Sequence, residues 1–403
     1  MKKYLNFIFV IIAGAIIFTG CSADKDINNS KAFVEEQDSQ ENFVSHQSMS
    51  CYANDETGYY FVQNDDRGSV FLYAIDKQTQ ECHPLCNKSD CLHDEEESYE
   101  KRTTCNAFLG AVSIEIVLYD NGFLYYVKSV EIKDKDGNSH VLDKICRKSI
   151  DGTKTEEIFS TEDYSFGNFK MHRGYLYLEL VKWDSEGIAS DDKANIYRLS
   201  TDGKGEPELA VNLNKMRKKY PDMWIFDTRY YGDNILFEIQ YTYNKQDKRT
   251  IINYDLNTKK WKDIGDNLDI EIDTMFTVFN DKILFGNQAK IYECDFNGEN
   301  LKEAIDCKEL IKGYAYVTPY CNDGKNIYIT ASNNYDDYSD EIIICDENYK
   351  ATTQKLPIKF KPTIGFDETA FIYFDEYTGE LYWIDKSDYS SKLIYEFSVN
   401  AER

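Results

Sequence analysis

Residues 280–298, "NDKILFGNQAKIYECDFNG", contain the pattern that decides the fold. A polar turn leads into a short apolar strand, and a second apolar strand follows and ends at an acidic turn with an Asn-Gly pair. Aromatic and branched aliphatic side chains fit a pleated, half-buried surface, and Asn-Gly pairs supply the positive φ angles that tight hairpins need. The stretch therefore predicts antiparallel strands joined by short turns.

The same pattern returns along the chain from Tyr59 onward. Its first strand is found in "NGFLYYV" (121–127) and "RGYLYLEL" (173–180), and its second in "NIYRLSTDG" (195–203) and "LYWIDKSD" (381–388). The turn after the second strand carries an aspartate in seven units, separated by 75, 51, 53, 40, 51 and 39 residues: Asp76, Asp151, Asp202, Asp255, Asp295, Asp346 and Asp385.

A period near fifty residues with several strands per unit is typical of a β-propeller. One small sheet cannot bury both of its faces, whereas blades stacked around an axis bury them and remove long exposed edges. We therefore predict an all-β chain with a single propeller of seven blades. Six blades is the alternative, if the first and last partial units share one blade. A turn of helix is expected between two units, within 213–224.

The N-terminal 50 residues differ in composition from the rest of the chain. Lys2 and Lys3 precede an apolar run that is short for a membrane span, and a small residue precedes Cys21. This order predicts an export signal at 1–20. Residues 21–50 are polar and acidic, which predicts a flexible tether to a propeller domain that spans 51–403.

The sequence Phe18-Thr19-Gly20-Cys21 resembles the lipobox of bacterial lipoproteins, in which the cysteine is lipidated. The resemblance implies an acyl chain such as palmitate on Cys21, the lipid bilayer as a partner, and a location at the outer face of the cytoplasmic membrane. An uncleaved anchor helix and a signal cleaved elsewhere are the alternatives.

The formal net charge of −25 limits the possible partners. Such an acidic chain is not a basic nucleic-acid reader, because phosphate binding needs clustered positive charge. Docking on an anionic membrane surface through charge is excluded for the same reason. Attachment to a membrane must therefore depend on the lipid.

Residues 82–93, "CHPLCNKSDCLH", begin a cluster of cysteine and histidine that ends near Cys105. The cluster falls in the longest gap between turn aspartates, which predicts an insertion at 82–108, after the closing strand of the first blade. The set Cys86, Cys91, His93 and Cys105 offers three thiolates and one imidazole, which satisfy zinc in a closed tetrahedron. Four protein ligands predict a structural zinc, and Cys82 is not required.

Disulfide bonding is the alternative, because exported proteins usually pair their cysteines. Ten cysteines remain when Cys21 is excluded. Cys146, Cys294 and Cys345 precede turn aspartates in strands, however, and are expected to be buried single thiols. Full pairing of the ten is therefore not expected.

A family resemblance adds to this pattern. The segment 381–386, "LYWIDK", resembles the Tyr-Trp-Thr-Asp repeat of low-density-lipoprotein-receptor propellers. The whole chain is similar to uncharacterised clostridial-type lipoproteins with such a propeller or a TolB-like one. The residues that carry this likeness are Leu85-Cys86, Cys91-Leu92-His93 and Cys105-Asn106-Ala107-Phe108. The resemblance implies a surface lipoprotein with a propeller and no particular activity.

Enzyme motifs are mostly absent from the sequence. There is no Gly-x-Ser-x-Gly elbow, no His-Glu-x-x-His and no phosphate-cradling glycine loop, so no catalytic residue is named. His140 and His172 lie near turns and are expected to face water. Two classes of function remain. The first is a binding or scaffold module for a protein, peptide or glycan, and the alternative is an extracytoplasmic lyase or glycosidase with carboxylates in the propeller funnel.

Overall fold

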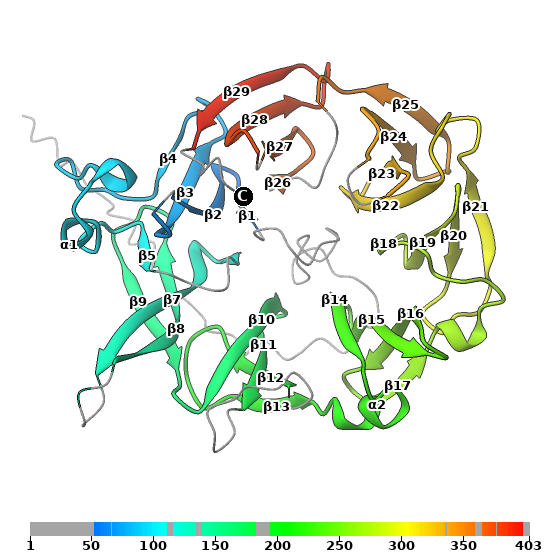
Figure 1. Cartoon of the computed structure of the whole chain (residues 1–403), viewed down its shortest axis with the longest axis horizontal. Coiled ribbons are helices and arrows are strands. Elements are labelled where there is room, and N and C mark those ends of the chain that lie inside the picture. The colour runs from blue at the N-terminus through cyan, green and yellow to red at the C-terminus, as the bar shows by residue number, and fades with distance from the viewer. Residues whose placement is uncertain are drawn as a thin grey trace, which may run out of the picture.

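Seven antiparallel sheets surround a central axis in the computed structural model (Figure 1). It describes residues 52–397 apart from 66, 111–115, 134–136, 138, 183–193, 335–336, 359–364 and 376. The predicted all-β propeller of seven blades is confirmed. The alternative of six blades is wrong, because the first and last blades are separate sheets, with five and four strands of their own.

Each blade is built from strands that are consecutive in sequence, with the first strand nearest the axis (Figure 1). The first three blades contain β1 (Ala53–Asn54), β2 (Gly58–Asn64), β3 (Val70–Asp76), β4 (Cys82–Pro84) and β5 (Phe108–Gly110); β6 (Val117–Asp120), β7 (Phe123–Lys133), β8 (Ser139–Ser149) and β9 (Thr155–Ser160); β10 (Tyr164–His172), β11 (Tyr175–Lys182), β12 (Asn195–Ser200) and β13 (Glu208–Val211).

The remaining four blades follow the same order. They contain β14 (Trp224–Tyr231), β15 (Asn234–Tyr243), β16 (Gln246–Asp255) and β17 (Lys260–Asp263); β18 (Phe276–Phe279), β19 (Lys282–Asn287), β20 (Lys290–Cys294) and β21 (Lys302–Asp306); β22 (Tyr316–Asn322), β23 (Asn326–Ser332), β24 (Glu341–Asp346) and β25 (Ala351–Lys355); β26 (Gly365–Phe366), β27 (Ala370–Asp375), β28 (Glu380–Asp385) and β29 (Ser391–Glu396).

Helical structure in the described residues is limited to short turns. These are η2 (His93–Glu95), α1 (Tyr99–Arg102), α2 (Asn214–Lys219) and η4 (Gly265–Asn267). The helical turn expected within 213–224 is confirmed by α2. In the same part of the chain, no helix is long and apolar enough to cross a bilayer.

The recurring aspartates have a local structural role. Each lies at the end of the third strand of its blade or within two residues of it. In all seven, one carboxylate oxygen accepts a hydrogen bond from the backbone N–H two residues later, at 2.7–3.0 Å. This is the aspartate turn that competes with regular structure, so it ends the third strand and starts the return to the fourth.

The core lies between neighbouring blades and consists of aliphatic and aromatic side chains from their facing sheets. Cys146, Cys294 and Cys345 are free thiols buried within it, as predicted. Their burial raises the pKa of each thiol, which keeps them neutral and unreactive.

We call the junction between the first and last blades the seam. Among the described residues, no strand of one of these blades pairs with a strand of the other. Buried side chains of both blades pack together at the seam. The rings of Tyr59 and Trp383 meet edge to face with centroids 5.7 Å apart, and Lys77 forms an ion pair with Asp367 at 2.8 Å. Within residues 52–397, the seam is therefore held by side-chain packing and charge.

The Cys/His insertion interrupts the outer strand of the first blade. The two short strands β4 and β5 both pair with β3. Leu72 in β3 accepts a hydrogen bond from Leu85 N at 2.7 Å and donates its own N–H to Ala107 O at 2.9 Å. The insertion leaves and rejoins the sheet at one residue. The expectation that it follows the closing strand was wrong, because that strand resumes at Phe108.

Candidate metal centre and candidate binding groove

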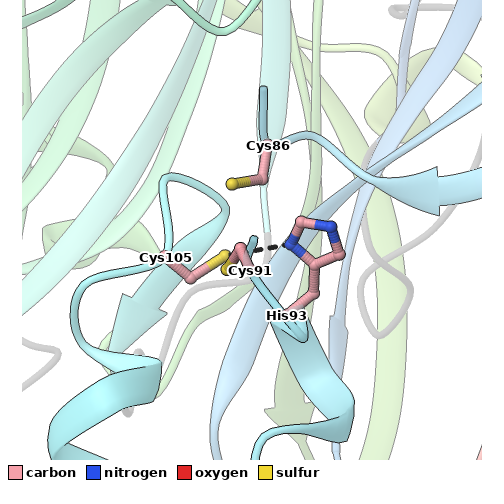
Figure 2. A group of neighbouring side chains, drawn as sticks. All are labelled: Cys86, Cys91, His93 and Cys105. Carbon is pink, nitrogen blue, oxygen red and sulfur yellow. Dashed lines mark hydrogen bonds between the residues drawn. The ribbon is translucent and has the colours of Figure 1, made fainter. Parts of the chain in front are cut away.

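The four predicted ligands converge in the insertion (Figure 2). Their ligand atoms all lie within 4.8 Å of one another, and Cys105 Sγ is 3.7 Å from His93 Nδ1. A zinc tetrahedron with bonds of about 2.0–2.3 Å places its ligand atoms roughly 3.5–3.8 Å apart. Cys86, Cys91, His93 and Cys105 therefore fit a closed Cys₃His set.

Local backbone structure places these side chains. Cys86 follows directly after the residue that leaves the sheet, and His93 opens the single turn η2. His93 has a φ of 57°, a left-handed conformation that is uncommon for a residue with a side chain and that clusters at functional sites. Ser98 caps α1 by accepting a bond from Lys101 N, and Cys105 N donates to Arg102 O after that helix.

A buried arginine attaches the insertion to the first blade. Arg102 Nη1 donates to Asp65 Oδ2 at 2.6 Å and to Ser69 Oγ at 2.9 Å, and its side chain is 6% exposed. Arg67, next to the same hairpin, donates to the carbonyl oxygens of Glu96 and Asp94. The insertion is thus held from one side by charged hydrogen bonds, which are stronger than neutral ones.

The thiols of the cluster differ in their electrostatic surroundings. Burial opposes ionisation of Cys86, but hydrogen bonds from the backbone of Lys88 and Asn106 hold its pKa below the ordinary value. Burial raises the pKa of Cys105 to about 12. The set therefore contains one sulfur that is prepared to ionise and one that needs a cation nearby to do so.

Lys148 of β8 supplies a positive charge beside the cluster. It is 1% exposed, and its ammonium group donates to Asn106 O, next to Cys105. Among the described residues, no carboxylate forms an ion pair with it. Burial lowers its pKa to about 8, while the charges of Cys86 and Cys105 act in the opposite direction. A buried cation without a carboxylate needs negative charge from another source.

The other predicted site residues are placed as follows. Cys82 lies in β4 opposite Ile75, outside the cluster, and lines a groove of about 480 Å³ at the outer edge of the seam. Cys21 lies outside the described residues. His172 is buried rather than exposed, because the fourth blade covers it and its Nε2 donates to Gly232 O at 2.7 Å. That expectation was wrong.

A second groove of about 520 Å³ lies beside the β15–β16 hairpin, where the chain passes from blade 4 to blade 5. It is open to solvent, and Tyr243 at its edge is 61% exposed. Charged and polar side chains dominate its lining: Tyr241, Tyr243, Asp247, Lys248, Arg249, Thr250, Asp263, Asp266, Asp269, Glu271 and Asp273.

Charges in this groove are only partly paired. Lys248 forms an ion pair with Glu271, and Lys219, outside the lining, reaches Asp263 at 3.0 Å. The lining contains six carboxylates and two cationic side chains. The groove therefore carries an excess of negative charge that attracts cations.

A buried charged group lies behind the groove. Arg249, in the lining, donates to Glu238 Oε1 at 3.3 Å, and Arg229 pairs with Asp227 at 3.0 Å. Burial raises the pKa of Glu238 to about 7. Asp227 and Glu238 are cross-strand neighbours, but they are 6% and 0% exposed. These two acids therefore act within the protein and do not contact a molecule in the groove.

The sequence alone did not identify Lys148 and Asp94 as neighbours of the Cys/His cluster, and it did not identify the groove. Lysine in a strand usually faces water, so nothing in the sequence marks Lys148 as buried. The groove carried one weak signal, which is the surplus of tyrosine in a chain with 32 of them.

No protein-family model matches the chain, and no curated protein matches it in sequence. Among solved structures, the chain is similar to the β-propeller domain of the Trilobed protease from Pyrococcus furiosus, described as having an open velcro topology (11% identity, 88% of this chain and 97% of that one, TM-score 0.45).

The chain is also similar to TolB from Acinetobacter baumannii (13% identity, 86% and 79% covered, TM-score 0.36). A third similar structure is an oligogalacturonate lyase from Vibrio parahaemolyticus (10% identity, 89% and 91% covered, TM-score 0.47). At these identities and TM-scores, no conclusion about function is drawn from the likeness.

Proposed function

We propose that the protein is a lipid-anchored, extracytoplasmic binding protein whose propeller holds a ligand without transforming it. The groove beside the β15–β16 hairpin supports this role best. It is open, measures about 520 Å³, and combines the exposed ring of Tyr243 with charged groups of both signs. Concave sites with a few placed polar groups and rigid aromatic rings are typical of binding surfaces.

The anchor in this proposal is Cys21. Its support is the order of basic, apolar and Gly-Cys parts in the first 21 residues. The formal charge of −25 supports a lipid anchor rather than electrostatic attachment. The proposed location is the outer face of the cytoplasmic membrane.

The ligand that fits the groove best is a basic peptide or an exposed basic segment of a protein. Six carboxylates and two cationic side chains line the groove, which attracts positive charge. Tyr243 and Tyr241 add flat, amphipathic surfaces for apolar stems of lysine or arginine. A glycan is the other ligand class that such rings accept.

A non-catalytic role agrees with the chemistry of the lining. The described lining residues include neither histidine nor cysteine. The paired acids Asp227 and Glu238 are buried behind the groove. The alternative role as a lyase or glycosidase would require two of the six lining carboxylates to contact substrate as acid and base.

A binding experiment with residues 22–403 tests this function. We expect fluorescent lysine- and arginine-rich peptides to bind with an affinity that falls as salt rises, and to survive incubation intact. Tyr243→Ala and Asp269→Asn should weaken binding at least about tenfold, because each removes a contact in the groove. Tyr377→Ala, in the seventh blade and 71% exposed, is the matched control.

Other outcomes contradict parts of this proposal. Binding to a glycan array alone replaces the peptide by a glycan. Turnover of a glycan that is lost on replacing a groove carboxylate overturns the non-catalytic role. Equal binding by Tyr243→Ala and by the wild type removes the groove from the proposal.

We also propose that Cys86, Cys91, His93 and Cys105 hold one structural zinc. Four protein ligands leave no open position for a substrate. Three thiolates, one neutral imidazole and Zn²⁺ carry a net charge of −1, which complements the buried ammonium group of Lys148. Disulfide pairing would leave this ammonium group without its opposite charge.

Elemental analysis and alkylation mass spectrometry test the zinc site. About one zinc per chain is expected, with the three ligand thiols reduced and with zinc lost in His93→Ala. His83→Ala is the matched control, because His83 lies in β4 outside the cluster. Absence of zinc together with Cys86, Cys91 and Cys105 in disulfides would refute the site.

A further inference from the structure

The seam is the one junction between neighbouring blades that the polypeptide itself does not cross. Every other pair of neighbouring blades is joined by the chain as it passes from one sheet to the next (Figure 1). In the residues that the structure describes, no strand pairing crosses the seam. Any contact that links the first and last blades therefore has a greater effect on ring closure than an equal contact elsewhere.

One residue of the insertion contacts both sides of the seam. Asp94 Oδ2 accepts a hydrogen bond from Tyr73 OH of β3 at 2.7 Å and another from Tyr395 OH of β29 at 3.0 Å. The two tyrosine rings also meet edge to face, with centroids 5.9 Å apart. A single carboxylate oxygen thus connects the first blade to the seventh through residues 301 positions apart.

Asp94 directly follows the proposed zinc ligand His93. Both residues lie in the single turn η2, so the position of the His93 ring and that of the Asp94 carboxylate depend on the same few backbone angles. The turn has little apolar anchoring of its own, since Leu92 before it is 58% exposed and none of its residues is buried. A metal ion on His93 would therefore fix the orientation of Asp94.

The cluster also reaches the second blade. Lys148 of β8 donates to Asn106 O, between the ligand Cys105 and the point where the chain rejoins the sheet. Arg102 holds the helix between the ligands onto the hairpin that carries Asp65 and Ser69. The insertion is consequently in contact with three consecutive blades of the ring, which are the seventh, the first and the second.

We propose that zinc on Cys86, Cys91, His93 and Cys105 stabilises the closed propeller ring. The metal does so because it fixes Asp94 in the position that accepts hydrogen bonds from both Tyr73 and Tyr395. This inference rests on the proposed zinc site and adds a role to it. Binding of the metal strengthens closure of the seam. Removal of the metal leaves the seventh blade attached to the first by packing and by contacts that do not involve the insertion, such as the Lys77–Asp367 ion pair and the hydrogen bond from Tyr52 OH to Phe366 O at 2.8 Å.

Hydrogen exchange measured by mass spectrometry tests the proposal, because each blade yields its own peptides. Residues 22–403 are compared with zinc bound and after chelation. Chelation should speed exchange in β26–β29 and in β1–β3 at least about fivefold, as expected for loss of hydrogen bonds to a charged acceptor. Exchange in β14–β17, across the ring, should not change.

Two conservative variants separate the link from the metal. Tyr395→Phe removes the hydroxyl that reaches Asp94 and leaves all four ligands in place. It should keep one zinc per chain, show fast exchange in the seventh blade even with zinc, and respond little to chelation. Tyr382→Phe is the matched control, because its hydroxyl donates to Glu380 Oε2 within the same blade, at 2.9 Å.

The possible failures are distinguishable. If no zinc binds, both the zinc site and its proposed role in closing the ring are refuted. If zinc binds but chelation leaves hydrogen exchange in the seventh blade unchanged, or speeds exchange equally in all blades, the zinc site stands and its role in closing the ring is refuted. If Tyr395→Phe loses zinc, the hydroxyl is needed by the metal site itself, and the proposal that the metal acts on the seam through Asp94 is refuted.

Discussion

Replacing Asp367 by asparagine should weaken the seam at neutral pH and have little effect in acid. Burial alone would raise the pKa of Asp367, but hydrogen bonds from Lys77, Thr369 and Tyr59 hold it at about 2. A pKa lowered from 3.8 to about 2 corresponds to roughly 2.5 kcal/mol at pH 7. The side chains of the pair are 19% and 18% exposed, so screening by solvent reduces this to about 1–2 kcal/mol.

The sign of the pH dependence follows from the lowered pKa. A carboxyl whose folded-state pKa is below its unfolded value stabilises the protein above about pH 4, and this stabilisation is lost as pH falls through about 2. Asp367→Asn should therefore lower the free energy of unfolding by about 1–2 kcal/mol at pH 7 and much less at pH 2.5.

Urea unfolding followed by the fluorescence of Trp383 measures this difference, since Trp383 packs against Tyr59 at the seam. Zinc is chelated at both pH values so that acid release of metal does not contribute. Asp202→Asn is the matched control. Its pKa is also lowered to about 2, but its ion pair with Lys204 has side chains 47% and 84% exposed. An equal effect of Asp367→Asn at both pH values would falsify the reasoning.

Three further predictions follow from separate features. Cys21→Ala should release the protein from membranes or block its processing, and normal cleavage with membrane fractionation of the variant would contradict lipidation. The wild type should lose thermal stability as pH rises from about 5 to about 8, because a buried carboxyl with a raised pKa destabilises the fold once it ionises, and Glu238→Gln should flatten this loss. An unchanged pH profile of the melting temperature in the variant counts against this. Gly286→Ala should lower the free energy of unfolding in urea by about 1–3 kcal/mol, because a Cβ there overlaps Val317 O and the hydroxyl of Thr274. Gly122→Asn is the control and should be tolerated, because Gly122 lies at an open turn position with a φ of 81°.

Features that depend on local sequence were predictable. The turn aspartates bond to the backbone two residues away, so a short stretch such as Asp295-Phe296-Asn297 contains both the donor and the acceptor. Repetition of that stretch gave the number of blades. The proposed zinc ligands Cys86, Cys91 and His93 lie within eight residues, which is why their spacing alone indicated a metal site.

Features that depend on which blades are neighbours were not predictable from local pattern. The contact of Asp94 with Tyr395 spans 301 residues and exists only because the ring closes. His172 looked exposed because it lies near a turn, but the next blade covers it. The return of the chain to the outer edge of the first blade at Phe108 was also not predictable. The strand there has three residues, which is too short to show a periodic pattern.

The construction of every blade from one unbroken stretch of chain has a consequence for how the gene can be rearranged. A circular permutation that joins the present ends and opens the chain between any two blades would leave all seven sheets intact. The place where the ring lacks a covalent junction would move with the new ends. In a chain that begins at the fourth blade, the seventh and first blades would be joined by peptide bonds, and the Cys/His insertion would reinforce a junction that no longer needs it.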